Sequence, residues 1–213
     1  GVSVNGLRLL GVRYVVAPQP LPGYEVVYQG DKTNALVLRD PNAPPRAYFV
    51  GEVETLPDEE AVWSRVHEQT FDPSRIALVE EGVTATTTPI DSSSTASVDI
   101  MRFTPDEITY SVDTDAPRLL VASEIYYPAG WKAYVDGEET PILRVDHLLR
   151  GIQVPRGASE VVMRFEPAMF KTSFAISAAS SAIVYLTILA LLVLAWRRRE
   201  AEEEKGELVA ASE

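Results

Sequence analysis

The apolar positions of this chain follow two different patterns. From Arg75 onward, short segments alternate apolar and polar residues or run apolar between turn signals, which predicts β-strands. Eight segments have this character: "RIALVEE", "SVDIMRF", "EITYSVD", "RLLVASEIYY", "WKAYVDG", "TPILRVD", "RGIQVP" and "EVVMRFEP". Short strands at this spacing predict a mainly β fold, an antiparallel β-sandwich of the immunoglobulin-like or jelly-roll-like kind.

Turn residues between these segments support the same prediction. Asp136-Gly137 falls between two apolar runs, and a two-residue type I′ hairpin turn needs residues that tolerate positive φ at both positions. Pro155 to Gly157 predicts the next reversal. The Ser/Thr-rich stretch from Thr84 to Ser97 predicts an exposed loop.

The region before Arg75 contains one helical pattern. In "TLPDEEAVWSRVHEQ", Thr55 is a candidate N-cap with Asp58 three residues later, and Val62, Trp63 and Val66 fall on one helical face. We therefore expect one amphipathic helix there.

The first part of the chain predicts strands and then a boundary. The apolar run from Leu7 to Pro18 is followed by "YEVVYQG" and "NALVLRD", which read as short strands. The proline-rich stretch from Pro41 to Phe49 predicts a domain junction. We assign residues 1–45 to the end of an upstream α/β or β subdomain, and residues 46–172 to the β-sandwich domain.

The second pattern is a long apolar run near the C-terminus. No charged residue occurs between Lys171 and Arg197, and a helix of this length crosses a bilayer core of roughly 30 Å. We predict a transmembrane helix over residues 173–196. It is followed at once by Arg197, Arg198 and Arg199, which mark the cytoplasmic side of a span. Residues 197–213 are then expected to form a disordered cytoplasmic tail, and residues 1–172 to lie outside the cytoplasm of a bacterial cell.

The start of the chain carries no export signal of its own. It begins "GVSVNGLRLL", without an initiator Met or an apolar h-region. We expect an upstream membrane domain of the same protein to deliver the large domain across the bilayer.

The composition of the chain limits which partners and which kinds of functional site are expected. The net charge of -12 argues against a nucleic-acid partner, and the absence of cysteine excludes disulfides and thiol nucleophiles. The two histidines, His67 and His147, lack metal-ligand spacing and read as surface or packing residues. Asp113 and Asp115 have a D-x-D spacing, but before a proline at a strand end they favour a turn. The sequence shows no catalytic constellation, and we expect neither a cofactor nor a metal.

One stretch, "SEIYYPAGWKAYVDG", concentrates aromatic residues in a chain that is 8% aromatic. Aromatic faces stack on sugar rings, so a set of five residues could bind an envelope glycan: Glu124, Tyr126, Tyr127, Trp131 and Arg150. The alternative is a hydrophobic corner in which the aromatics fill the sandwich and each polar tip finds a backbone partner. We favour the corner, because strand alternation need not point all the aromatics in one direction.

The region from Leu119 to Phe170 resembles the C-terminal region of the YfhO family of bacterial multi-spanning membrane proteins. The stretches "SEIYYPAGWKAYVDG" and "LLRGIQVPRG" carry most of the resemblance, and "LRLLGVRYVVAP" and "PRAYFV" match weaker features in the same order. Ala129, between Pro128 and Gly130, departs from the family pattern, in which Pro is followed directly by Gly.

The resemblance implies a function related to GT-C-type glycosyltransferases. Such enzymes take sugars from polyprenyl-phosphate donors at the outer face of the membrane, and the family is linked to glycosylation of envelope polymers such as lipoteichoic acid. The catalytic acid is expected in an early outer loop, so no catalytic residue is assigned here. This part would be a non-catalytic domain that orients or binds the acceptor. The alternative is a membrane-anchored structural or glycan-binding surface module without enzymatic activity.

Overall fold

The computed structural model describes residues 3–31 and 35–210, and within this part it leaves out the side chains of residues 168–172 and 198–210. The chain divides into two compact units, Gly1–Glu166 and Pro167–Glu213. Each unit is described by itself.

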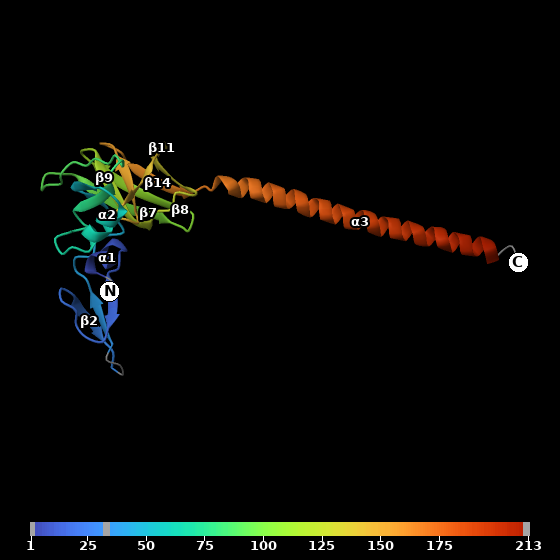
Figure 1. Cartoon of the computed structure of the whole chain (residues 1–213), viewed down its shortest axis with the longest axis horizontal. Coiled ribbons are helices and arrows are strands. Elements are labelled where there is room, and N and C mark those ends of the chain that lie inside the picture. The colour runs from blue at the N-terminus through green and yellow to red at the C-terminus, as the bar shows by residue number, and fades with distance from the viewer. Residues whose placement is uncertain (1–2, 32–34, 211–213) are drawn as a thin grey trace. The chain divides into compact units, whose positions relative to one another are not determined.

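The first unit contains a β-sandwich built from two antiparallel sheets (Figure 1). The five-stranded sheet has the order β11-β10-β14-β8-β7. Its strands are β7 (Ala96–Phe103), β8 (Glu107–Thr114), β10 (Trp131–Val135), β11 (Glu138–Thr140) and β14 (Glu160–Phe165). The four-stranded sheet has the order β12-β13-β9-β4. Its strands are β4 (Ala47–Val50), β9 (Arg118–Ile125), β12 (Ile142–Val145) and β13 (Leu149–Val154). The predicted mainly β, antiparallel fold is confirmed.

Strand β9 has buried side chains on both of its faces. Leu120 and Ala122 belong to the core between the two sheets, whereas Leu119 and Val121 belong to a second core on the other face of the four-stranded sheet. Successive side chains of a strand point to opposite faces, so a strand that is buried on both faces reads as a continuous apolar run. The sequence "RLLVA" therefore contains a continuous apolar run, because β9 is buried on both faces.

The predicted strand at "RIALVEE" exists, but it lies outside the sandwich. It is β6 (Ile76–Glu80), which pairs in parallel with β5 (Glu52–Leu56). A parallel pair needs a crossover connection, and α2 (Glu59–Val66) provides it. The β5–α2–β6 segment contributes Val62, Leu78 and Val79 to the second core. The assignment of this strand to the antiparallel set was wrong, because its apolar run is equally compatible with a parallel pair.

The amphipathic helix is confirmed, but its N-cap is not Thr55. The N-cap is Asp58, whose side chain accepts a hydrogen bond from the backbone N–H of Ala61. Thr55 instead lies in β5. Asp is as good an N-cap as Thr, and the proline before it ends the preceding strand. On the helix, Val62 and Val66 are buried, whereas Trp63 is 48% exposed.

The N-terminal part begins with a helix where the sequence predicted a strand. Helix α1 (Val4–Leu9) is capped by the Ser3 side chain, which accepts from the backbone N–H of Gly6. The chain turns at Gly11, which has a φ of 67°, before the strand begins. The following sheet has the order β1-β3-β2, with β1 (Tyr14–Ala17), β2 (Glu25–Gln29) and β3 (Leu36–Arg39). Only the second half of the predicted run is therefore a strand.

The second unit contains one long helix, α3 (Ala168–Ala210). Its segment Ser173–Arg197 has a mean hydropathy of 2.3 and is long and apolar enough to cross a membrane. The helix continues through the acidic residues that were expected to be a disordered tail, and Glu, Ala and Lys are good helix formers. Arg197 is exposed, whereas the side chains of Arg198 and Arg199 and residues 211–213 lie outside the described part.

Candidate functional site

Three of the five predicted ligand-binding residues line one hollow on the sandwich. Tyr126, Tyr127 and Trp131 lie around a space of about 260 Å³, which we call the aromatic hollow. The remaining lining residues are Pro128, Lys132, Glu139, Thr140, Pro141 and Ile142. They come from the β9–β10 corner, β10, β11 and the start of β12.

The corner is fixed by backbone hydrogen bonds. The N–H of Tyr126 donates to the carbonyl oxygen of Leu148 at 2.7 Å, which holds the end of β9. Gly130 has a φ of 125°, and its N–H donates to the Pro128 carbonyl oxygen at 2.9 Å. Because L-residues rarely adopt this φ, glycine is required where the chain turns into β10. Ala129 is accommodated within this turn.

Trp131 packs on groups behind the hollow. The Arg150 guanidinium carbon lies 4.0 Å from the centroid of the Trp131 ring, and the Phe165 ring centroid lies 5.6 Å from it. Trp131 is half-buried and also packs against the core between the sheets. Its ring therefore serves the structural corner and forms one wall of the hollow.

Arg150 supports this wall but does not line the hollow. It is 4% exposed, and its Nε donates to the carbonyl oxygen of Ile125 at 2.9 Å. Burial lowers the pKa of Arg150, although the nearby Glu124 carboxylate and Tyr110 hydroxyl act in the opposite direction. A guanidinium stacked on an indole in a dry environment contributes a cation–π interaction. Arg150 is thus placed to fix the orientation of Trp131.

Glu124 lies outside the hollow as well. Its carboxylate accepts a hydrogen bond from Nε of Arg46 at 2.7 Å, and its side chain is 17% exposed. The structure therefore separates the five predicted residues into three that line the hollow and two that do not.

The hollow has a polar edge that the sequence interpretation missed. Lys132 Nζ donates to Glu139 Oε2 at 2.9 Å, and this hydrogen bond raises the pKa of Lys132. Tyr127 is 54% exposed, so an aromatic face and an ion pair are both open to solvent. The signal for Glu139 was present, because the Asp136-Gly137 turn fixes the register in which Tyr134 pairs with Glu139. Lys132 and Tyr134 lie on the same face of that strand.

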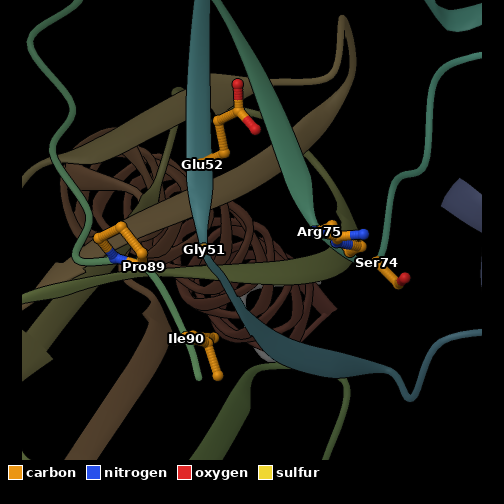
Figure 2. A pocket seen from close by; sticks show the side chains of 6 residues that line it. All are labelled: Gly51, Glu52, Ser74, Arg75, Pro89 and Ile90. Atoms are coloured by element: carbon orange, nitrogen blue, oxygen red, sulfur yellow. The ribbon is translucent and has the colours of Figure 1, made fainter. Parts of the chain in front are cut away.

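A larger hollow of about 400 Å³ lies around Gly51 and lacks convergent chemistry. Figure 2 shows its six lining residues, with the Glu52 carboxylate and the Arg75 side chain on separate sides of Gly51. Among the described residues, the printed contact between Glu52 and Arg75 is a backbone hydrogen bond, in which the Glu52 N–H donates to the Arg75 carbonyl oxygen at 3.1 Å. Gly51 lies close to the loop at Ile90, because a Cβ on Gly51 would approach the Ile90 backbone nitrogen to 3.2 Å.

The histidines take part in packing. The Trp63 ring centroid lies 4.3 Å from that of His67 and 5.0 Å from that of His147. In residues 3–31 and 35–210, no group of three or more His, Cys, Asp or Glu side chains is arranged to hold a metal ion. Asp115 pairs with the buried Arg118 at 2.8 Å and accepts from the Thr95 backbone N–H. Asp115 thus belongs to the turn that follows β8, whereas Asp113 lies in β8 itself.

One buried acid gave no recognisable sequence signal. Asp146 is fully buried at a φ of 51°, and Oδ1 accepts from the backbone N–H of Leu78 at 2.7 Å. Within the described residues its Oδ2 has no hydrogen-bond partner. Burial raises the pKa of Asp146 to about 7. The sequence "RVDH" resembles an ordinary strand end, so only the three-dimensional packing reveals this carboxyl.

Comparison with known proteins identifies the family. The family model described as "Bacterial membrane protein YfhO" matches residues 62–177, which is more than half of the chain. The chain belongs to the YfhO family. The matched YfhO region runs from α2 through the sandwich and the aromatic hollow into the first turns of α3. The resemblance inferred from the sequence is therefore confirmed. In the part of this YfhO chain that the structure describes, one helix is long and apolar enough to span a bilayer, as expected for a family of membrane proteins.

Solved structures and curated proteins add little to the family assignment. A cryo-EM structure of the arabinofuranosyltransferase AftD from mycobacteria is 20% identical, with a TM-score of 0.30. The similarity covers 46% of this YfhO chain and 6% of the AftD chain. No curated protein matches the YfhO chain significantly.

Proposed function

We propose that this YfhO chain is the C-terminal part of a bacterial membrane protein that takes part in glycosylating a cell-envelope polymer. In this proposal the sandwich is a non-catalytic domain that binds the saccharide acceptor in the aromatic hollow. The sugar donor would be a polyprenyl-phosphate sugar, and the transfer chemistry would belong to an upstream membrane domain. Lipoteichoic-acid-type polymers are the acceptors that the family analogy suggests.

The observation that carries the proposal is the composition of the aromatic hollow. Tyr126, Tyr127 and Trp131 surround it, and Lys132 and Glu139 stand at its edge. A sugar ring has apolar C–H faces and a periphery of hydroxyl groups. Aromatic faces bind the former, and a charged pair hydrogen-bonds the latter more strongly than neutral groups do.

The proposed location follows from the charges beside the span. The arginine cluster at residues 197–199 follows the apolar segment directly, and clustered arginines favour the cytoplasmic side. Residues 1–172 would then face the outside of the cytoplasmic membrane, where envelope polymers are located.

A second candidate function is a membrane-anchored structural or glycan-binding surface module without a link to catalysis. The packing of Trp131 against Arg150 and Phe165 favours a purely structural use of the corner. The two candidates differ in what the aromatic side chains contribute, and substitution distinguishes them.

The test compares Tyr127→Ala with Tyr28→Ala in the full chain reconstituted in nanodiscs. Both tyrosines are exposed, at 54% and 59%, but only Tyr127 lines the hollow. Binding of lipoteichoic acid carrying hexose substituents should weaken about 5- to 100-fold in Tyr127→Ala, by analogy with the loss of a stacked base. Tyr28→Ala should bind like the wild type, and both variants should keep the wild-type melting temperature. Titration calorimetry measures the binding of the polymer, and thermal melts measure the melting temperature.

Trp131→Ala completes this test. Because Trp131 is half-buried against the core, its truncation should destabilise the domain by about 2 to 4 kcal/mol. A wild type that binds neither the substituted nor the unsubstituted polymer would contradict the acceptor role. In that case a low melting temperature of Trp131→Ala would support the structural module.

A further inference from the structure

Large apolar side chains are exposed together on the sandwich. Among the described residues, Met101 is 68% exposed, Phe103 50%, Ile125 55%, Tyr127 54% and Phe165 39%. We call these five residues the apolar rim. Single exposed apolar residues are common on soluble surfaces, whereas a contiguous group marks an interaction site.

Hydrogen bonds and register place Phe103, Phe165 and Ile125 at one end of the sandwich, and Met101 lies two residues before Phe103 on β7. Phe103 pairs with Ile108 across the β7–β8 turn. In that turn the Asp106 carbonyl oxygen accepts from the Phe165 N–H at 2.8 Å. Phe165 in turn pairs with Trp131 at the start of β10. The β7–β8 turn, the end of β14 and the start of β10 are therefore neighbours.

Arg150 connects the end of β9 to the same group. Its Nε donates to the carbonyl oxygen of Ile125, and its guanidinium lies on the Trp131 ring. Ile125 and Tyr127 thus belong to the same end of the sandwich as Phe165.

The chain leaves the sandwich at this end and leads into the apolar segment. Phe165 is the last residue of β14, and the apolar segment of α3 begins at Ser173. The eight Cα–Cα steps from Phe165 to Ser173 span at most about 29 Å when fully extended. The chain therefore limits how far Phe165, at the end of β14, can lie from the start of the apolar segment.

The charges at this end are balanced, unlike those of the whole chain. Arg46 pairs with Glu124, and both Arg102 and Arg164 pair with Glu107. With Asp106 and Glu166 included, three basic groups face four acidic ones, whereas the net charge of the chain is -12. The arginine side chains are 48–63% exposed and can extend toward lipid phosphates. This end is thus the part of an acidic domain that can approach a lipid surface without strong repulsion.

We propose that the apolar rim docks on the membrane that anchors the chain, with its side chains inserted at the level of the lipid headgroups. The partner is a lipid surface, and the apolar side chains supply the binding energy because the local charges nearly cancel. Tyr side chains such as that of Tyr127 are favoured at this depth, because one end of the ring is apolar and the other carries a hydroxyl that stays hydrated. The Met, Ile and Phe side chains of the rim contribute apolar area. Docking goes beyond the proposed acceptor binding, because it fixes the orientation of the sandwich on the membrane whatever the hollow binds.

The absence of cysteine makes a direct test possible. Met101→Cys carries an environment-sensitive fluorophore on the rim, and Ser93→Cys carries the same fluorophore before the opposite end of β7, which spans Ala96–Phe103. The full chain is reconstituted in phosphatidylcholine nanodiscs with or without a lipid that has a doxyl group near the headgroup. The fluorophore at position 101 should be quenched at least twofold, and the one at position 93 should change little. Equal quenching, or none at position 101, would overturn the proposal.

A second variant separates docking from mere proximity through the tether. Phe103→Ser with Ile125→Ser, introduced into the Met101→Cys chain, alters exposed side chains and leaves Tyr127 and the aromatic hollow intact. Quenching at position 101 should fall to the level seen at position 93, with an unchanged melting temperature. Undiminished quenching would show proximity without docking and would refute the proposal, as would quenching that requires anionic lipid. Docking is measured by quenching in a variant that keeps Tyr127, and saccharide binding is measured by calorimetry, so failure of the acceptor role and failure of docking are distinguishable.

Discussion

At the scale of single residues, Asp146 is the group whose behaviour departs most from its sequence context. It is fully buried, and it is held between β12 and β13 by a pair of hydrogen bonds with Leu78, one from each backbone N–H. Its other carboxyl oxygen, Oδ2, is buried without a partner in the described residues. An ionised carboxylate in this position is costly, so burial favours the protonated acid.

This arrangement predicts that stability falls as the pH rises. In the unfolded chain Asp146 ionises near 3.8, whereas burial raises its pKa to about 7 in the folded protein. Between these values the unfolded state binds fewer protons, so the stabilisation present at pH 4 is lost progressively up to about pH 7. Asp146→Asn should flatten this slope, which amounts to about 4 kcal/mol at most. Urea unfolding of the full chain in detergent micelles between pH 4 and pH 8 measures it.

The matched control is Asp113→Asn, which changes an exposed carboxyl on β8. It should keep the wild-type slope. If Asp146→Asn kept that slope too, Asp146 would be ionised and stabilised in the folded protein by a partner other than Leu78.

Part of the candidate site could be predicted from single residues in the sequence. The aromatic cluster was found because aromatic residues are locally concentrated, and Tyr126, Tyr127 and Trp131 do lie together. Arg150 and Glu124 were included by residue type alone, and their actual partners, Trp131 and Arg46, depend on contacts between separate strands. Such long-range pairings are not encoded in local sequence patterns.

At the scale of elements, the β10–β11 hairpin shows the strongest agreement between sequence and structure. Asp136 and Gly137 have φ angles of 48° and 87°, as the predicted type I′ turn requires. The Asp136 carboxylate also accepts hydrogen bonds from the N–H groups of Ser159 and Glu160 and from the Ser159 hydroxyl. These hydrogen bonds lower the pKa of Asp136 and connect the turn to the start of β14.

Asp136→Asn tests this connection without disturbing the turn. Asn tolerates the left-handed conformation as well as Asp does, so the change removes the charge and leaves the backbone unstrained. The expected loss is about 1 kcal/mol, because hydrogen bonds to an ionised acceptor are stronger than those to an amide. Thermal melts at pH 7 and pH 3 provide the measurement. The difference between Asp136→Asn and the wild type should shrink at pH 3, because there the carboxyl of the unfolded chain, with its ordinary pKa of 3.8, is largely protonated and the advantage of the folded carboxylate decreases. A constant difference would contradict this account.

The elements that the sequence misplaced share one physical cause. The strand at Ile76–Glu80 is short and apolar, and the short helix at Val4–Leu9 overlaps the start of the apolar run Leu7–Pro18. Segments of this length do not distinguish strand from helix, or parallel from antiparallel pairing, by their periodicity. Each is decided by what covers it: β6 by its parallel partner β5, and α1 by Leu9, which is buried in the second core. In contrast, the sandwich strands carry turn residues at their ends, and all seven predicted there are present in the structure.

At the scale of the whole molecule, the fold class and the membrane helix were predictable because they depend on long, repeated patterns. Many short strands indicate a β-sandwich, and one uninterrupted apolar run indicates a membrane-spanning helix. The second core was not predictable, since it requires β9 to be buried on both faces by elements far away in the sequence. The same limitation applies to the apolar rim, which gathers residues from separate strands.

The orientation of the chain in the membrane is the property on which the proposed function depends most. Three arginines follow the apolar segment of α3, and positively charged flanks are retained on the cytoplasmic side during insertion, whereas the acidic residues beyond them contribute little. Single cysteines introduced at Ser93 and at Ala211 should therefore differ in how strongly a membrane-impermeant maleimide labels them on intact cells. Ser93→Cys should be labelled without permeabilisation, and Ala211→Cys only after it. Replacing Arg197, Arg198 and Arg199 together by Gln should weaken this asymmetry, since it removes the charges that set it. Labelling of Ala211→Cys in intact wild-type cells would place the sandwich in the cytoplasm, where it could not meet an envelope polymer, and would refute the acceptor role.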